Sequence, residues 1–137
     1  MKSAVLTIFF LILQLSVVAQ DSDTVKYQSL EPYDFHLQYL KEDSAILLDA
    51  REFFEYRRSR IHDAVFMPPS KGFETAADTI DKNWSIFCYC YNGGRSVRAL
   101  EFFYDKGFRK LYNLEGGIVA WRKDDFPLDK NRIRRKR

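Results

Sequence analysis

Two short apolar runs constrain the fold of this 137-residue chain more than any other feature of its sequence. AILLDA occupies residues 45–50 and SIFCYC occupies residues 85–90, and each has the length of a strand. Neither run alternates apolar with polar residues, so both faces of each strand must be buried. Strands of this kind occur in parallel sheets that are covered by helices, and the two runs therefore predict an α/β fold.

The rest of the chain supplies helices between the strands. Pro32 suits the first turn of a helix, Gly107 suits the end of one, and Pro68 stops a strand. The predicted strands are residues 45–50, 64–69, 85–90 and 110–114, and the predicted helices are residues 32–40, 51–60, 96–106 and 116–123, with a weak helix or loop at 70–81. This alternation predicts a parallel sheet covered on both faces.

The first 19 residues have the layout of a secretory signal peptide. Lys2 is followed by an apolar run at residues 4–13 and by the small residue Ala19, after which the chain becomes polar. A retained membrane anchor is the alternative, but the run is shorter than the ~20 apolar residues that a span needs. We predict cleavage after Ala19 and an exported, periplasmic protein without stable membrane insertion.

The remaining chain is expected to form one domain and to act as a monomer. A single core normally takes roughly 100 to 150 residues, and 46% of the residues are hydrophobic, which is enough for a core without disulfides. The predicted organisation is a signal peptide at 1–19, a polar segment at 20–28, a folded domain at 29–128 and a disordered basic tail at 129–137. The net charge of +3 is too small to indicate nucleic acid as the main partner.

The segment CYNGGRS, residues 90–96, carries the candidate chemistry. Cys90 ends a predicted strand, and ligands of open parallel sheets sit beyond the carboxyl ends of the strands. The loop that follows consists of Tyr91, Asn92, Gly93, Gly94, Arg95 and Ser96. Backbone N–H groups of such a glycine-rich loop converge on an anion, while the helix that begins at Ser96 and the side chain of Arg95 add positive charge.

A thiol in that setting is expected to have a pKa below its ordinary value of about 8.5, so Cys90 is the candidate nucleophile. The alternative is a buried core cysteine that happens to precede a glycine turn. The strand before the loop, the arginine within it and the helix after it together favour the nucleophile. Neither a metal nor another cofactor is expected, because the chain has only two cysteines and no His-x-x-His spacing.

Cys88 lies two residues before Cys90 on the same predicted strand, and therefore on the same face. Their Cα atoms would be roughly 6.5 to 7 Å apart, at the outer limit of disulfide geometry. We expect Cys88 to pack in the core. A thiol redox pair of Cys88 and Cys90 stays open as an alternative.

Three segments together resemble single-domain rhodaneses, a family of sulfurtransferases: ILLDAREFFEYRRSRIHDAVFMP, CYNGGRS and LEGGIVAWRKDDFPL. The resemblance extends from about Ser29 to Leu128. It implies a rhodanese-like fold, a five-stranded, mainly parallel sheet flanked by helices on both faces. It also implies that Cys90 carries a sulfane sulfur as a persulfide, that the loop wraps this sulfur, and that Arg95 orients an anionic donor such as thiosulfate.

The resemblance also suggests supporting residues. Asp49 and Arg51 match the family's Asp-x-Arg after the first central strand, and we interpret Arg51 as the partner of Glu55 in a structural ion pair. The closing Gly-Gly-x-x-x-Trp motif is matched by Gly116, Gly117 and Trp121, and the tryptophan is expected to pack in the core.

Two departures from the family lie in one turn. Residues 59–60 are Ser-Arg where the family usually has Gly-His, and residues 62–63 are His-Asp in place of Pro-Gly. We interpret both as altered turn chemistry that leaves the activity in place and affects the choice of partner.

The rhodanese-like fold also occurs in cysteine phosphatases. The length of the loop between Cys90 and Arg95 favours sulfur transfer over phosphate chemistry. Four residues separate Cys90 from Arg95, whereas cysteine phosphatases use Cys-x5-Arg, a longer loop that surrounds a phosphate. The sequence therefore predicts an enzyme of the thiosulfate sulfurtransferase type, which passes sulfur to a thiol, to cyanide or to a partner protein. A sulfur-relay or binding module with little turnover of small molecules is the alternative.

Overall fold

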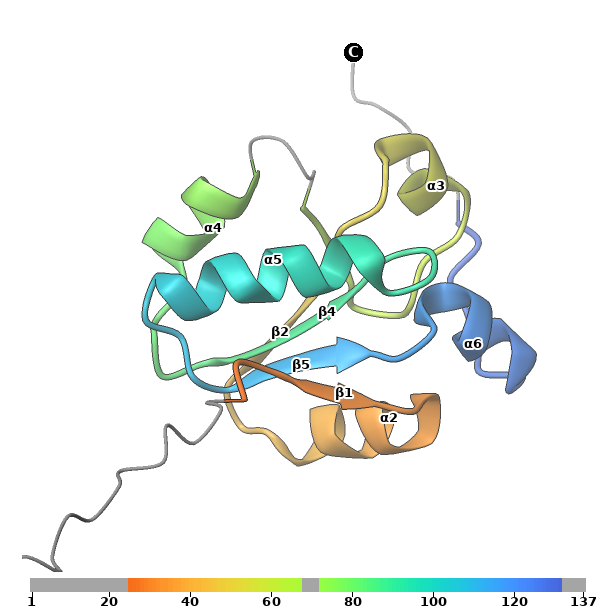
Figure 1. Ribbon diagram of the computed structural model, residues 1–137. Helices are drawn as coiled ribbons and strands as arrows, with labels where there is room; N and C mark the ends of the chain where they lie inside the picture. Colours follow the sequence, from red (N-terminus) through yellow and green to blue (C-terminus); the bar gives the residue numbers. More distant parts are fainter. Residues whose placement is uncertain (1–24, 68–71, 132–137) are drawn as a thin grey trace, which may run out of the picture.

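A five-stranded parallel sheet forms the centre of the protein. The computed structural model describes residues 25–67 and 72–131. The strands are β1 (Gln28–Leu30), β2 (Ala45–Asp49), β3 (Val65–Phe66), β4 (Ser85–Tyr89) and β5 (Leu111–Leu114), in the spatial order β1-β5-β4-β2-β3. Every neighbouring pair is parallel, so the carboxyl ends of all the strands meet at one edge of the sheet (Figure 1).

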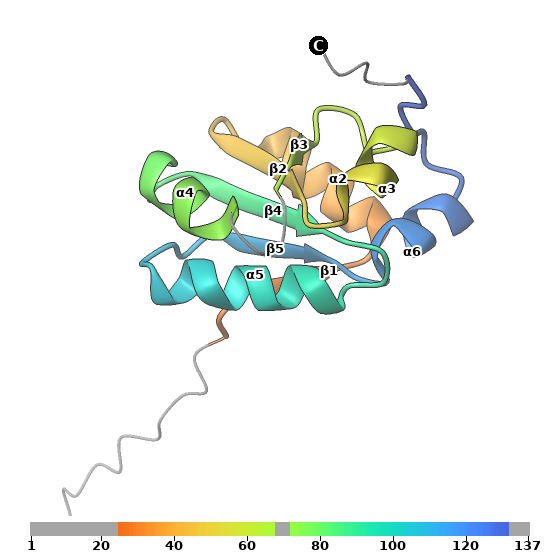
Figure 2. The same cartoon turned by 90° about the horizontal axis from the view of Figure 1, so that it is seen from above.

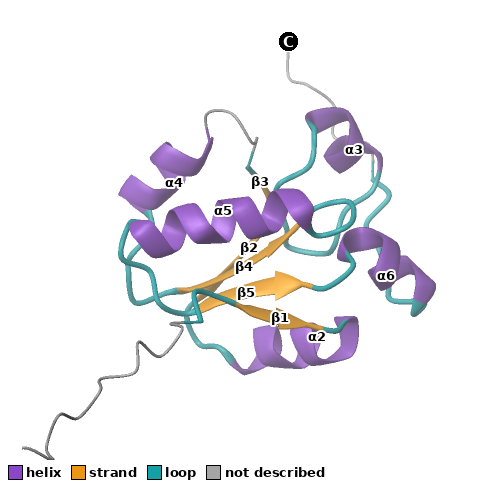
Figure 3. Ribbon diagram, viewed as in Figure 1, coloured by secondary structure: helices purple, strands orange, loops and turns teal. Residues whose placement is uncertain are grey.

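Helices cover both faces of this sheet. They are α2 (Pro32–Lys41), α3 (Phe53–Arg58), α4 (Gly72–Thr79), α5 (Gly94–Asp105) and α6 (Gly117–Lys123). Helices α4 and α5 lie on one face and α2 lies on the other (Figure 1, Figure 2). Helices α3 and α6 lie at the carboxyl edge of the sheet, near the start of α5 (Figure 3). The expected α/β fold, a five-stranded and mainly parallel sheet flanked by helices on both faces, is therefore confirmed.

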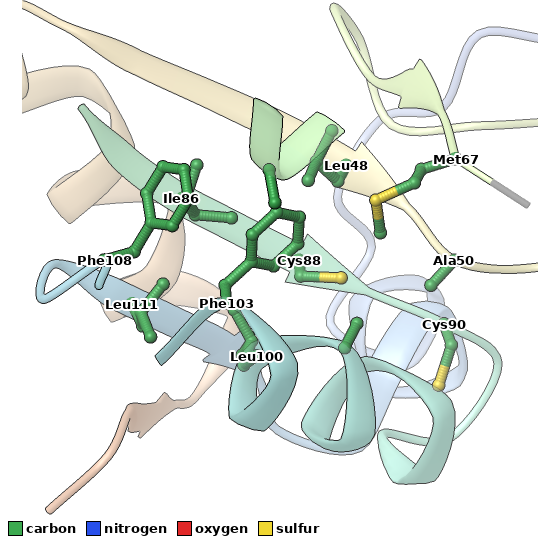
Figure 4. Close-up of a cluster of buried hydrophobic side chains, with 12 residues drawn as sticks. Leu48, Ala50, Met67, Ile86, Cys88, Cys90, Leu100, Phe103, Phe108 and Leu111 are labelled. Atoms are coloured by element: carbon green, nitrogen blue, oxygen red, sulfur yellow. The ribbon is translucent and has the colours of Figure 1, made fainter. Parts of the chain in front are cut away.

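The central strand β4 is buried on both faces, as its unbroken apolar sequence predicts. Alternate residues serve two clusters: Ile86 and Cys88 pack with α4 and α5, whereas Phe87 and Tyr89 pack with α2 and α6. Figure 4 shows the first cluster, with Cys88 among its side chains and Cys90 beside the start of α5. The same alternation that builds the core thus directs Cys90 toward α5.

Strand β1 lies where the sequence indicated only the end of a polar segment and the start of the domain. Gln28–Leu30 pairs with β5 through its backbone, and its side chains are exposed or half-buried. An edge strand of this kind needs no apolar pattern, which is why side-chain periodicity did not identify it. Helix boundaries also differ from the predictions by one or two residues: the helix predicted at 51–60 spans Phe53–Arg58, for example, and the helix predicted from Ser96 begins at Gly94.

Both predicted terminal segments fall wholly or partly outside the described residues. The predicted signal peptide at 1–19 lies outside them entirely, so its cleavage and the export of the protein stay predictions. The predicted tail is described as far as residue 131, and Asp129 exchanges backbone hydrogen bonds of 3.0 and 2.8 Å with Arg60. Among the described residues, no helix has the length and apolar character needed to cross a membrane.

Phe103 tests how much the α5 side of the core contributes to stability. Its ring is fully buried and lies 5.2 Å from that of Phe108, measured between ring centroids. We expect Phe103→Ala to lower the free energy of unfolding by about 3–5 kcal/mol, because the truncated side chain leaves a cavity. Phe54→Ala removes a ring that is 70% exposed, and as a control it should change stability by about 0.5 kcal/mol at most. Urea unfolding measures both, and equal losses would contradict the prediction.

Candidate active site

The Cys90 loop, residues 90–96, joins β4 to α5 at the carboxyl edge of the sheet. Cys90 follows directly on the last residue of β4, and α5 begins at Gly94. Gly93 caps the helix with φ at 105°, in the left-handed region that glycine adopts without strain. This turn brings the N-terminus of α5 back toward the side chain of Cys90.

Hydrogen-bond donors surround the sulfur of Cys90. The backbone N–H of Gly93 donates to Sγ at 3.1 Å, and Ser96 Oγ lies 3.5 Å from Sγ. Burial acts to raise the pKa of this thiol, but the Ser96 hydroxyl and the N–H groups of Ser96, Gly93 and Arg95 outweigh burial and lower the pKa below its ordinary value. The loop is therefore arranged to stabilise a negatively charged sulfur.

The first turn of α6 holds the Cys90 loop in place. The N–H of Ile118 donates to the carbonyl of Cys90 at 2.9 Å, and the N–H of Val119 donates to the carbonyl of Tyr91 at 3.2 Å. The N–H groups at the start of a helix have no partner within the helix, so they are available for these contacts. These contacts anchor the start of the loop, directly before the N–H groups of Gly93, Arg95 and Ser96 that face the sulfur.

Gly117 allows α6 to come this close to the loop. Its φ is 61°, and a Cβ atom at this position would lie 2.5 Å from Tyr91 O and 2.6 Å from Cys90 O. The structure thus gives a physical reason for the second glycine of the Gly-Gly motif. Trp121 of the same motif is buried, and its indole N–H donates to the carbonyl of Pro127 at 3.0 Å, as expected for a packing residue.

Asp49 and Arg51 form a buried ion pair with each other, so the predicted pair of Arg51 with Glu55 is wrong. The Arg51 guanidinium donates to both carboxylate oxygens of Asp49, the closest at 2.6 Å. Tyr89 Oη donates to the same carboxylate at 2.5 Å and accepts from the N–H of Ile61. The prediction assumed helical spacing, but α3 begins after Arg51, at Phe53.

Glu55 pairs instead with Arg95 of the Cys90 loop. The two terminal guanidinium nitrogens of Arg95 lie 3.2 and 3.3 Å from Glu55 Oε2. The same oxygen accepts the N–H of Glu52 at 3.0 Å, as part of a capping box at the start of α3. The positive charge of Arg95 is therefore engaged, and an anionic ligand of Arg95 must compete with Glu55.

A cleft of about 590 Å³ lies beside the loop. Its walls carry three exposed cations, Arg58, Arg122 and Lys130, and two exposed aromatic rings, Phe54 and Tyr91. Arg122 donates to Ser59 Oγ, which also lines the cleft, at 2.7 Å. The cleft thus combines positive charge with apolar surface.

The two cysteines differ in their relation to this cleft. Cys90 is fully buried, but Tyr91 beside it is half exposed and lines the cleft, so a reactant reaches the sulfur only when the loop shifts. Cys88 is also fully buried, and burial, together with the nearby Cys90 and Asp49, raises its pKa well above the ordinary value. Both are free thiols, and Cys88 packs in the core as predicted.

Two buried polar side chains near the loop were missed by the sequence analysis. On β5, Asn113 Oδ1 accepts a hydrogen bond of 2.7 Å from Ser96 Oγ, and on β4 the hydroxyl of Tyr89 donates to the carboxylate of Asp49. A polar side chain in a fully buried strand needs a hydrogen-bond partner. The presence of these two polar residues in apolar strand segments could therefore have indicated buried hydrogen bonds near the loop. In the part of the chain that the structure describes, no three His, Cys, Asp or Glu side chains are grouped so as to hold a metal ion.

Comparisons with known proteins agree with this geometry. The family model described as the rhodanese-like domain matches residues 34–124. The chain is 34% identical over 100 residues to the tRNA uridine(34) hydroxylase of Aster yellows witches'-broom phytoplasma, covering 69% of this chain but only 32% of that protein. It therefore spans about a third of the length of that relative.

Another relative and a solved structure match over most of their own length. The chain is 25% identical over 92 residues to the thiosulfate sulfurtransferase GlpE of Actinobacillus pleuropneumoniae, covering 67% of this chain and 84% of that protein. The crystal structure of a rhodanese-related protein from Thermoplasma volcanium matches with a TM-score of 0.66 and 26% identity, covering 77% of this chain and all of that one.

Gly117→Ala tests the contact between α6 and the Cys90 loop. Gly107→Ala is the matched control, because Gly107 also has a positive φ, 98°, but an added Cβ would meet nothing within 4 Å. The control should lose about 1–2 kcal/mol of stability through backbone strain. We expect Gly117→Ala to lose clearly more and to raise the pKa of Cys90. Urea unfolding and the pH dependence of alkylation measure the two effects, and identical behaviour of the variants would contradict the prediction.

Proposed function

The chain belongs to the rhodanese-like domain family, and on this basis we propose that it is a sulfurtransferase that carries a sulfane sulfur as a persulfide on Cys90. The observation that carries the proposal is the convergence of donors from Gly93 and Ser96 on the Cys90 sulfur. They favour a thiolate, which is the nucleophilic form. Thiosulfate is the proposed donor, and similarity to a relative named thiosulfate sulfurtransferase supports this choice.

The proposed reaction consists of two displacements. In the first, the Cys90 thiolate attacks the outer sulfur of thiosulfate, a new S–S bond forms, the S–S bond of thiosulfate breaks, and sulfite leaves with the bonding electron pair. In the second, an acceptor thiolate or cyanide attacks the outer sulfur, and Cys90 leaves as a thiolate. No external oxidant or reductant is consumed. The N–H groups of the loop stabilise the negative charge on both the thiolate and the persulfide.

The cleft offers positive charge to an anionic donor. Arg58, Arg122 and Lys130 line it, and none of them forms a salt bridge with another described residue. Cations that line a cleft raise the local concentration of anions and speed their arrival. Arg95 lies in the loop itself, and we propose that the bound donor displaces Glu55 from it.

The shape of the cleft supports a second candidate, a sulfur relay to a partner protein. A volume of about 590 Å³ exceeds what a small anion fills, and exposed Phe54 and Tyr91 would stay uncovered by thiosulfate. Aromatic and arginine side chains are enriched at protein interfaces. Rates of sulfur release to cyanide and to a reduced dithiol protein such as thioredoxin distinguish the two candidates, since a relay is slow with cyanide and fast with the protein.

Intact mass spectrometry tests the persulfide directly. After incubation with thiosulfate, the reduced protein is expected to gain the mass of one sulfur atom, and Cys90→Ser is expected to gain nothing. Cys88→Ser is the control and should keep the gain, because Cys88 is buried in the core. No gain in the wild-type protein would contradict the proposal. Mild oxidation that yields a Cys88–Cys90 disulfide, with no sulfur added, would instead support the redox alternative.

The contact between Glu55 and Arg95 predicts the effect of Glu55→Gln on donor binding. Loss of the carboxylate frees the charge of Arg95, so KM for thiosulfate is expected to fall by about 2- to 10-fold with little change in kcat. The amide oxygen of glutamine still accepts the N–H of Glu52, which preserves the start of α3. Glu52→Gln is the matched control, because it removes an equal charge from the N-cap of the same helix. Steady-state kinetics that show the same KM in both variants would contradict this competition.

A further inference from the structure

Asn113 is a buried polar side chain that the proposed reaction leaves unexplained. It is 3% exposed on β5, and the sheet register places it beside Cys88 of β4 and Ser29 of β1. A buried amide is costly unless its oxygen and its nitrogen are both hydrogen-bonded. Asn113 meets this condition between two hydroxyl groups: Oδ1 lies 2.7 Å from Ser96 Oγ, and Nδ2 lies 3.0 Å from Ser29 Oγ.

Ser96 connects this amide to the sulfur of Cys90. Its Oγ lies 2.7 Å from Asn113 Oδ1, 2.9 Å from Gly93 O and 3.5 Å from Cys90 Sγ. A hydroxyl group has one proton, so Ser96 donates to one of these acceptors at a time. The orientation of the Asn113 amide affects the choice, because its oxygen accepts the proton of Ser96 whereas its NH2 group does not.

The distances allow two complete arrangements of this hydrogen-bonded chain, with opposite directions. In the present one, Ser96 donates to Asn113 Oδ1 and Asn113 Nδ2 donates to Ser29, and a neutral Cys90 thiol would then donate to Ser96. In the reverse one, Ser29 donates to Asn113, Asn113 donates to Ser96, and Ser96 donates to a negatively charged sulfur. A half-turn of the amide exchanges its oxygen and nitrogen with almost no change in shape. Each hydroxyl keeps its own proton, and the thiol proton leaves to solvent.

We propose that Asn113 is a positioning residue whose amide reverses when Cys90 becomes a thiolate or a persulfide, so that the Ser96 hydroxyl donates to the charged sulfur. The inference rests on the proposed role of Cys90 as nucleophile. Hydrogen bonds to a charged acceptor are roughly twice as strong as neutral ones. A negative sulfur therefore competes successfully with Gly93 O for the proton of Ser96, once the amide oxygen has turned away.

The titratable and charged groups near Cys90 do not fix the direction of the Ser96 hydroxyl. Cys88, its neighbour on β4, is kept neutral because burial raises its pKa well above the ordinary value. Arg95 of α5 directs its guanidinium to Glu55 of α3. Helix α6 contributes backbone N–H groups to the carbonyls of the loop. Among the side chains that contact the sulfur, the orientation of the Ser96 hydroxyl is thus the adjustable one.

A double-mutant cycle on Asn113 and Ser96 tests the proposal. Asn113→Leu keeps a similar volume and removes both polar groups of the amide. Because the NH2 group that would hold the Ser96 hydroxyl toward the charged sulfur is then gone, the pKa of Cys90 is expected to rise by about one unit. The pH dependence of iodoacetamide alkylation gives this pKa, with mass spectrometry confirming that Cys90 is the residue modified. In a Ser96→Ala background the same substitution is expected to cause no shift, because the hydroxyl that Asn113 orients is gone.

Two results of the cycle would overturn the proposal. One is a shift of equal size in both backgrounds, which would mean that Asn113 acts on Cys90 directly or through general structure. The other is a folded Asn113→Leu protein, verified by circular dichroism, in which the pKa of Cys90 equals that of the wild type. A milder variant, Ser29→Ala, removes only the outer partner of the amide and is expected to shift the pKa in the same direction by a smaller amount; a shift in the opposite direction would also count against the proposal.

A measurement on the wild-type protein avoids any dependence on the folding of variants. The side-chain amide NMR signals of Asn113 are expected to shift with pH at the pKa of Cys90, and to stay constant in Cys90→Ser. Constant signals throughout the wild-type titration would overturn the proposal. Neither experiment uses a sulfur donor, so a failure to form the persulfide would count against the proposed function and not against this inference.

Discussion

The binding of two loop carbonyls by α6 is the interaction on which the rest of the site depends. The N–H groups of Ile118 and Val119 fix the carbonyls of Cys90 and Tyr91, and the peptide groups that follow are then free to point their N–H bonds at the sulfur. The arrangement is a consequence of topology. Strands β4 and β5 are parallel neighbours, so the helices that follow them start at the same edge of the sheet. One helix begins in the loop, and the other holds it.

The two ion pairs near the loop differ in how deeply they are buried, and this difference indicates that they have different roles. Asp49 and Arg51 are almost completely buried, and Arg51 also donates to the carbonyl of Ser59 at 2.7 Å, which ties the end of β2 to the turn after α3. Removing one partner of such a pair leaves an uncompensated charge, at a cost of about 3–5 kcal/mol. The side chains of Arg95 and Glu55 are only partly buried, at 35% and 18% exposed, and ion pairs that solvent reaches are worth about 1 kcal/mol or less. The first pair is therefore structural, whereas the second is weak enough to be opened by the anionic donor that we propose.

Sequence patterns were sufficient for features that depend on local periodicity. They predicted the buried strands β2 and β4 and placed Cys90 at the end of one of them, because unbroken apolar runs and glycine-rich turns are visible without knowledge of the partners. They missed β1, which is held by backbone pairing with β5 and buries little of its own side chains. They also missed the contact of Asn113 with Ser96, because it depends on how β5 is placed against the loop that follows β4, and a single sequence does not contain that register.

The donors that stabilise the sulfur of Cys90 also enclose it, and this limits how the proposed persulfide could form. Its outer sulfur would lie about 2 Å from Sγ, whereas the N–H nitrogen of Gly93 is only 3.1 Å from Sγ in the present structure. If the outer sulfur is to receive hydrogen bonds from the loop, the N–H groups of the loop must lie farther from Cys90 Sγ than they do in the present structure, to leave space for one more sulfur atom. The contacts with α6 fix only Cys90 and Tyr91, and the glycines at 93 and 94 follow them. In the proposed persulfide, the anchored part would hold Cys90 in place, while the glycine-rich part would move its N–H groups outward to accommodate the second sulfur.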